Sequence, residues 1–80
     1  MKLKILCFGI TRDIIGQFEY ELELTDGASV ADLKVILNDK FPSFKKLTSL
    51  RIALNTEYAQ DTDILKPNDE IVLIPPVSGG

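Results

Sequence analysis

Residues 18–24 read Phe-Glu-Tyr-Glu-Leu-Glu-Leu, an unbroken alternation of apolar and acidic side chains. Because successive side chains of a β-strand point to opposite faces, this alternation predicts a half-buried strand whose glutamates lie in water. Another strand is predicted upstream, over residues 2–8, where the side chains alternate in the same way. The loop between them, residues 11–16, is too short for a crossover helix, so the two strands are expected to form an antiparallel hairpin.

The alternation also assigns the two faces of the first strand. Leu3, Ile5 and Cys7 are expected to face the core, where a cysteine behaves as a small apolar side chain. The opposite face then carries two lysines and two apolar residues, namely Lys2, Lys4, Leu6 and Phe8. The lysines are free to meet the glutamates of the neighbouring strand diagonally.

A helix is predicted to begin at Ser29. This residue and Asp32 have the spacing of a capping box, in which each side chain accepts a hydrogen bond from the other residue's backbone N–H. Pro42 ends the helix because it cannot continue the hydrogen-bond pattern. The apolar stripe between them consists of Val30, Leu33, Leu37 and Phe41, with Ile36 beside it.

The sequence pattern after the helix predicts strands that are separated by turns. A linker containing Phe44 leads to a strand over residues 50–55, and a brief pairing segment is expected around Tyr58. In the strand, Leu50, Ile52 and Leu54 are predicted to point inward, and Arg51, Ala53 and Asn55 outward.

Residues 61–69 combine turn residues with two apolar residues, Ile64 and Leu65, that we expect to be buried. The last strand is predicted over residues 70–74 and ends at Pro75 and Pro76, since proline cannot donate a ladder hydrogen bond.

The resulting order is strand, strand, helix, strand, short strand, strand. One helix on one face of a mixed sheet of four to five strands predicts the α+β class and, within it, a ubiquitin-like β-grasp. In that fold the first and last strands lie side by side at the centre of the sheet. We expect one β-grasp domain over residues 1–74 and a flexible Gly-Gly tail over residues 75–80, which leaves from the middle of the sheet.

The last six residues, Pro-Pro-Val-Ser-Gly-Gly, suggest a functional arm. The prolines stiffen its base and the glycines leave no side chain at its tip, and six residues reach at most about 20 Å. The alternative is a frayed end or a cloning scar, but a terminal Gly-Gly pair arises by chance in only about one sequence in 200. A carboxylate must be activated before it reacts, and the chain has no phosphate-binding loop for ATP. The activating machinery must therefore be another protein.

Composition excludes several other functions. The net charge of −3 offers no footprint for nucleic acid, and no apolar run approaches the roughly 20 residues that a membrane span requires. With no histidine and one cysteine, the chain lacks the ligands of common metal sites and the usual nucleophile–base pairs. We expect a cytoplasmic location, because the single cysteine cannot form an internal disulfide and the N-terminus does not resemble a signal peptide.

Three segments carry a resemblance to a known family: residues 50–55 (Leu-Arg-Ile-Ala-Leu-Asn), 65–71 (Leu-Lys-Pro-Asn-Asp-Glu-Ile) and 74–80 (Ile-Pro-Pro-Val-Ser-Gly-Gly). They look like the MoaD group of the MoaD/ThiS sulfur carriers, and the likeness spans nearly the whole chain. One departure is Asn68, where many relatives have glycine. Since asparagine tolerates a positive φ, the turn is expected to survive.

The resemblance implies a carrier that is not itself catalytic and binds no cofactor. An E1-like adenylyltransferase, MoeB in bacteria, would use ATP to adenylate Gly80, with Gly79 beside it, and the product would be converted to a thiocarboxylate. The tail would then enter a large subunit, MoaE, which performs the catalysis. There it would donate sulfur to cyclic pyranopterin monophosphate during molybdenum cofactor biosynthesis. The implied assembly is a heterotetramer.

A partner is expected to cover the sheet face opposite the helix. Phe8 is the most informative residue there, because the pattern places it on an apolar patch instead of in the core. Arg12 could contact an acidic surface, or be a solvated loop charge. The predicted interface comprises Leu6, Phe8, Arg12, Arg51, Val72, Ile74, Pro75, Pro76, Val77 and Ser78. The alternative is a register shifted by one residue, which would make the patch part of the core.

Three other functions remain open from the sequence. The chain could deliver sulfur to thiamin thiazole or to tRNA thiolation, as ThiS-like carriers do. It could be a ubiquitin-like modifier that forms isopeptide bonds with lysines, although Val77 and Ser78 offer no basic stem. It could also be a plain interaction domain without tail chemistry.

Overall fold

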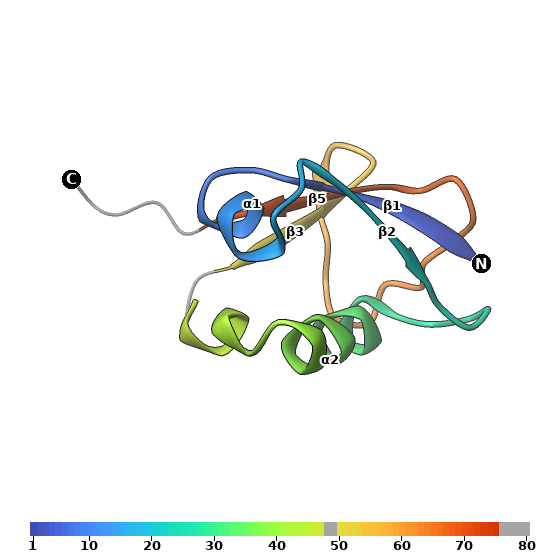
Figure 1. Ribbon diagram of the computed structural model, residues 1–80. Coiled ribbons are helices and arrows are strands. Elements are labelled where there is room, and N and C mark those ends of the chain that lie inside the picture. Colours follow the sequence, from blue (N-terminus) through green and yellow to red (C-terminus); the bar gives the residue numbers. More distant parts are fainter. Residues whose placement is uncertain (48–49, 76–80) are drawn as a thin grey trace.

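A computed structural model describes residues 1–47 and 50–75 of the chain, in which a sheet packs against one long helix (Figure 1). The helices are α1 (Ile10–Ile15), α2 (Val30–Lys40) and the 3₁₀ helix η1 (Pro42–Lys46). The strands are β1 (Lys2–Cys7), β2 (Glu19–Glu23), β3 (Arg51–Leu54), β4 (Glu57–Tyr58) and β5 (Glu70–Ile74). Within the described residues they form a five-stranded sheet in the order β2-β1-β5-β3-β4.

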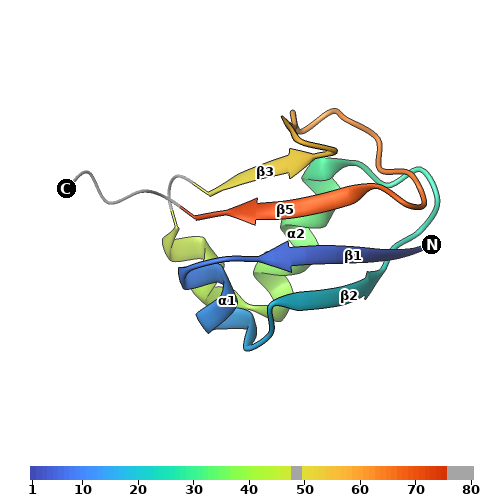
Figure 2. The same ribbon diagram turned by 90° about the horizontal axis from the view of Figure 1, so that it is seen from above.

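The predicted β-grasp arrangement is confirmed by the two central strands. β1 and β5 run parallel, side by side, with Ile5 opposite Ile71 and Cys7 opposite Leu73 (Figure 2). All four of these side chains have an exposed fraction of 0%. Since strands joined in parallel end at the same edge of the sheet, β5 ends beside the end of β1 and not beside the N-terminus.

The hairpin prediction is also confirmed. β1 and β2 pair antiparallel, and Leu3 lies opposite Leu22 on the core face. On the other face Lys4 Nζ lies 3.9 Å from Glu19 Oε2, a diagonal ion pair between two exposed side chains. Pairs of this kind contribute little to stability, and the remaining glutamates of β2 lie exposed as expected.

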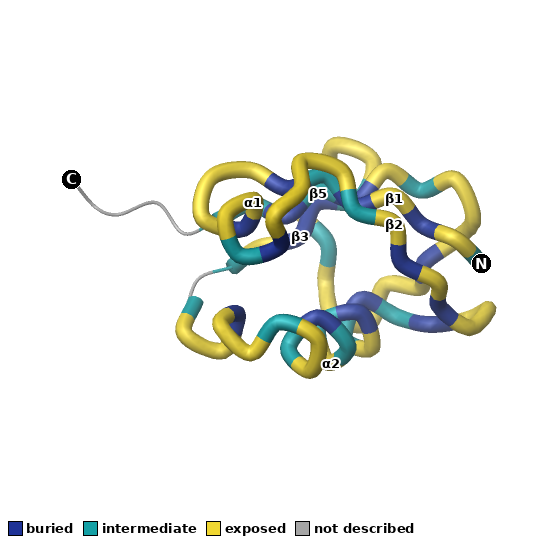
Figure 3. Tube along the Cα trace, viewed as in Figure 1, coloured by how far each residue is buried: buried dark blue, intermediate teal, exposed yellow. Residues whose placement is uncertain are grey.

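α2 begins where the capping box predicted. The backbone N–H of Asp32 donates to Ser29 Oγ at 3.2 Å, and the N–H of Ser29 donates to Asp32 Oδ2 at 3.0 Å. Val30, Leu33 and Leu37 are buried against the sheet, so one stripe of the helix closes the core (Figure 3). Phe41 caps the end of α2 and Pro42 begins η1.

The prediction of irregular structure is wrong for two segments, because each contains a short helix. The loop over residues 11–16 holds α1, which buries Thr11 and Ile15 and ends at Gly16, a residue with a φ of +85° that suits a left-handed cap. The linker around Phe44 holds η1, in which Phe44 is buried in the core. Both helices are too short to show helical periodicity, and packing of their buried residues against the rest of the core helps to stabilise them.

Three predictions of burial are also wrong. Phe18 lies just outside β2, at a bend, and its side chain is 46% exposed. Ile64 is 52% exposed whereas Leu65 is buried, so the segment sends one apolar side chain inward instead of two. Ala53 was expected to be exposed but is buried, because β3 lies between two other strands and Ala53 pairs with the larger Val72 and Tyr58 on either side.

The turn before β5 behaves as expected for Asn68, whose φ is +73°. Lys66 N–H donates to Asp69 Oδ2 at 2.7 Å, which closes the turn. The side chain of Asn55 ties this turn to the end of β3, since its Oδ1 accepts from Glu70 N–H and its Nδ2 donates to Asp69 Oδ1. β5 is therefore held in register from its first residue.

Candidate functional site: the tail exit and the open face of the sheet

The end of β5 sets the place from which the tail leaves. The last pair of the parallel ladder is Cys7 with Leu73, and Ile74 pairs with Arg51 on the other side. Pro75 follows, half-buried and close to Gly9, the residue that precedes α1. The remaining predicted tail residues, Pro76, Val77, Ser78, Gly79 and Gly80, lie outside the described residues. The base of the tail is thus fixed to the centre of the sheet.

Gly9 lets the chain turn away at this point, a role that the sequence did not reveal. Its φ is +56°, and a Cβ atom on it would lie 3.1 Å from Cγ of Pro75. The turn is held by the buried hydroxyl of Thr11, which accepts from the N–H of Phe8 at 3.0 Å and donates to its carbonyl oxygen at 2.6 Å. The backbone from Phe8 to Thr11 therefore packs closely against the first residue of the tail.

An apolar strip crosses the sheet face that α2 leaves open. Leu6 lies opposite Val72, and both are half-buried, as is Ile74. Phe8 continues the strip toward the tail exit and is 41% exposed. The alternative register is excluded, because Ile71 and Leu73 face the core and Val72 and Ile74 do not.

Two arginines border this strip and each stacks on an aromatic ring. Arg51 lies on β3 with its guanidinium carbon 5.1 Å from the centre of the Tyr58 ring. Arg12 lies on α1 with its guanidinium carbon 5.9 Å from the centre of the Phe18 ring. The structure thus places both predicted arginines at the edge of the apolar strip, while Phe18 is a surface residue that the alternating pattern had assigned to the core.

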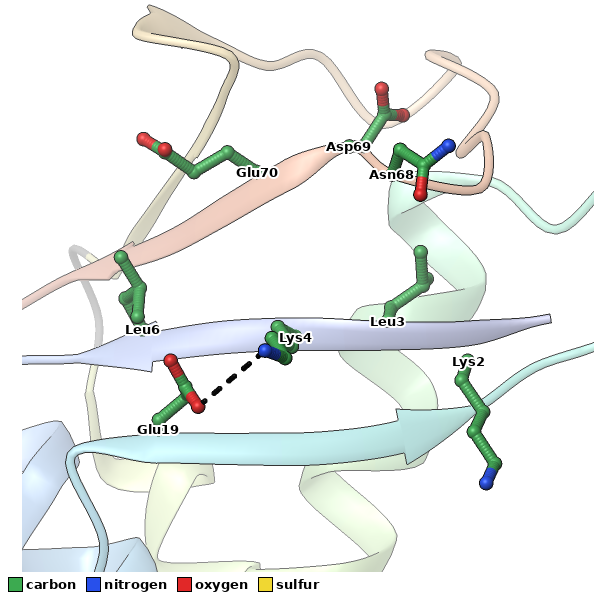
Figure 4. A pocket seen from close by; sticks show the side chains of 8 residues that line it. All are labelled: Lys2, Leu3, Lys4, Leu6, Glu19, Asn68, Asp69 and Glu70. Atoms are coloured by element: carbon green, nitrogen blue, oxygen red, sulfur yellow. Dashed lines mark ion pairs between the residues drawn. The ribbon is translucent and has the colours of Figure 1, made fainter.

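A shallow polar hollow of about 420 Å³ lies on the open face near the N-terminal end of β1 (Figure 4). The ion pair of Lys4 with Glu19 lines it, and Leu6 marks its border with the apolar strip (Figure 4). The other residues that line it are Lys2, Leu3, Asn68, Asp69 and Glu70. Its charges are mixed and largely exposed, and it lies away from the tail exit.

Cys7 is confirmed as a core residue. Its side chain is fully buried, and burial raises the pKa of the thiol above its ordinary value of 9.0. The thiol is therefore protonated at neutral pH and poorly suited to act as a nucleophile.

Within residues 1–47 and 50–75, no three His, Cys, Asp or Glu side chains gather closely enough to hold a metal ion. No helix of this same part of the chain is long and apolar enough to cross a bilayer.

Comparison with known proteins places the chain among sulfur carriers. The model of the ThiS family matches residues 5–80. A molybdopterin synthase sulfur carrier subunit from Chlamydomonas reinhardtii is 39% identical, and the match covers 100% of both chains. The corresponding subunit from Arabidopsis thaliana is 35% identical over 100% of this chain and 84% of the plant protein.

Solved structures agree with this assignment. A Pyrococcus furiosus protein assigned as molybdopterin converting factor subunit 1 superposes with a TM-score of 0.88 at 30% identity, covering 96% of this chain and 99% of the other. Small archaeal modifier protein 1 from Methanosarcina acetivorans gives 0.77 at 29%, covering 99% and 96%. A chain from the complex of subunits 1 and 2 of molybdopterin-converting factor from Helicobacter pylori gives 0.69 at 28%, covering 100% of both chains.

Proposed function

The chain belongs to the ThiS family, and from this membership we propose that it is the sulfur carrier subunit of a molybdopterin synthase. The observation that carries the proposal is full-length similarity to relatives named for that role, up to 39% identity in the relatives above. The fold is consistent with it, because the central strand β5 leads directly into the Pro-Pro-Val-Ser-Gly-Gly ending.

The proposed chemistry takes place at the carboxylate of Gly80. A carboxylate oxygen attacks the α-phosphate of ATP on a separate activating enzyme, an E1-like adenylyltransferase of the MoeB kind, and pyrophosphate leaves. Sulfide supplied by a sulfur donor then displaces AMP, so that one carboxylate oxygen is replaced by sulfur. The thiocarboxylate sulfur then bonds to cyclic pyranopterin monophosphate, and water cleaves the bond between this sulfur and the Gly80 carbonyl carbon, which restores the carboxylate. Gly79 leaves the tip narrow, so the terminal group fits a confined active site.

The large subunit of the synthase is the proposed partner on the open face. In the Helicobacter pylori structure, a similar chain belongs to a complex of subunits 1 and 2. On this chain the apolar strip of Leu6, Val72, Ile74 and Phe8 would meet that partner, with Arg12 and Arg51 at its edges. Pro75 to Ser78 would follow into the active site. A heterotetramer and a cytoplasmic location remain predictions.

Intact mass spectrometry tests the tail chemistry. The full chain is incubated with the activating enzyme, ATP and a sulfur donor, and a gain of about 16 Da is expected from the replacement of oxygen by sulfur at the activated carboxylate. A matched variant with one phenylalanine added after Gly80 should show no gain, because the added ring would block entry to the active site. An unchanged mass of the natural chain under competent conditions would contradict the proposal.

A second candidate, covalent protein modification, is favoured by the likeness to the Methanosarcina modifier protein. It predicts conjugates of higher mass that survive thiol reagents. Genetic rescue separates the proposed target of the sulfur from the others: restored molybdoenzyme activity in a strain that lacks its small subunit supports molybdopterin synthesis, whereas rescue of thiamin synthesis alone contradicts it.

A further inference from the structure

Phe18 is an aromatic residue whose position the core does not explain. Its side chain is 46% exposed, although its backbone is anchored: the carbonyl oxygen accepts a hydrogen bond from the N–H of Cys7 at 2.8 Å. The buried residues of the preceding helix, α1, are Thr11 and Ile15, so Phe18 is not among the side chains that fill the core here. The ring of Phe18 therefore lies on the surface, in a place that the backbone fixes.

The ring makes two directed contacts there. Its centre lies 5.0 Å from that of Phe8, with the two planes at 88°, an edge-to-face arrangement that the ring quadrupoles favour. The guanidinium carbon of Arg12 lies 5.9 Å from the centre of the same ring, within the range of a cation–π contact. Phe18 thus contacts an apolar residue that directly follows β1 and a charged residue of α1.

These contacts reduce the freedom of two side chains before any partner arrives. An exposed arginine ordinarily samples many rotamers and loses that freedom when it is immobilised at an interface. Stacking on Phe18 restricts Arg12 in advance, and the edge contact restricts Phe8 in the same way. The cluster of Phe8, Arg12 and Phe18 also lies at the end of the sheet where Pro75 leaves. Phe8 directly precedes Gly9, and Gly9 lies close to that proline.

We propose that Phe18 is a positioning residue for docking, which orients Phe8 and Arg12 toward the large subunit of the synthase. The partner surface that fits presents an apolar pocket for Phe8 next to a carboxylate for Arg12. The large subunit is chosen because the cluster continues the apolar strip to the tail exit, where the protein that receives the tail must sit. This inference rests on the proposed function.

Binding of the full chain to the large subunit, measured by calorimetry, tests the proposal. Phe18→Leu keeps apolar bulk but removes the aromatic face, and it is expected to raise Kd about fivefold. Phe18→Tyr retains the ring and should bind within about twofold of the natural chain. Val35→Ala is the matched control, because Val35 is an exposed apolar residue on α2, and it should also stay within about twofold. All variants should stay folded, with free energies of unfolding within about 1 kcal/mol of that of the natural chain.

A double-mutant cycle shows whether Phe18 acts through Arg12. In an Arg12→Gln background, Phe18→Leu should raise Kd by only about twofold, because the ring then has only its contact with Phe8 left to lose. A full fivefold effect in that background, or no effect in the natural background, would overturn the proposal.

Two further outcomes separate this inference from the function on which it rests. If the natural chain does not bind the large subunit at all, the proposed function fails. If it binds and Phe18→Leu weakens only the encounter with the activating enzyme, the function stands and the assignment of Phe18 to the large subunit is wrong.

Discussion

The two faces of the central strands carry apolar side chains for different reasons. Ile5 and Ile71 lie opposite one another on the face toward α2 and are fully buried. One position further along the same ladder, Leu6 and Val72 lie opposite one another on the other face and remain half-buried. Folding accounts for the first pair, since the core needs them. It does not require the second pair in the same way, and this is the face on which the proposed function places the large subunit.

The largest expected difference between the faces concerns stability. Ile71→Ala removes a fully buried side chain and should lower the free energy of unfolding by about 2 to 5 kcal/mol, whereas Val72→Ala should lower it by about 1 kcal/mol or less. Urea denaturation monitored by circular dichroism measures both. Equal losses would show that the two faces are equally part of the core.

For binding to the partner, substitutions on the open face are expected to have a larger effect than substitutions on the core face. Phe8→Ala should weaken binding to the large subunit by about 2 kcal/mol, roughly 30-fold, because exposed aromatic anchors dominate interfaces of this kind. Its free energy of unfolding should change by less than about 1 kcal/mol, since the side chain is 41% exposed. Val35→Ala on α2 serves as the control for both measurements. Unchanged affinity of Phe8→Ala would leave the open face without its proposed role.

Cys7 on the core face gives a prediction about pH. Burial raises the pKa of its thiol, so above pH 9.0 the unfolded chain loses this proton while the folded chain retains it. The contribution of Cys7 to stability is therefore complete below pH 9 and falls above it, by up to about 1.4 kcal/mol per pH unit. Unfolding curves of the natural chain and of Cys7→Ala should diverge in this direction between pH 9 and 10. If the stability of the natural chain and that of Cys7→Ala changed with pH in the same way, Cys7 would not be closed off from water on this face.

The smallest effect concerns the helix that covers the core face. Ser29→Ala removes the capping hydrogen bond to Asp32 N–H and should cost about 1 kcal/mol of stability, measured by urea denaturation. Ser43→Ala is a suitable control because Ser43 is exposed on η1, and its effect should stay within about 0.5 kcal/mol. A similar loss in both variants would mean that the cap does not hold α2 in place.

Sequence reasoning succeeded where the pattern is long or the local chemistry is specific. The alternation in β1, β2 and β5 predicted their faces correctly, and Ser29 with Asp32 marked the start of α2. It failed at short or irregular segments. α1 and η1 are stabilised by Thr11, Ile15 and Phe44 packing into the core, and nothing periodic signals such contacts.

The candidate site divides in the same way. The Pro-Pro-Val-Ser-Gly-Gly ending and the placement of Phe8 outside the core could be inferred from local sequence, because chain stiffness, lack of side chains and strand alternation are local properties. The approach of Gly9 to Pro75 and the stacking of Arg12 on Phe18 could not, because each joins residues that meet only when α1 and the central strands are packed together. Such contacts depend on distances between elements, and these distances are decided by how the whole core is filled.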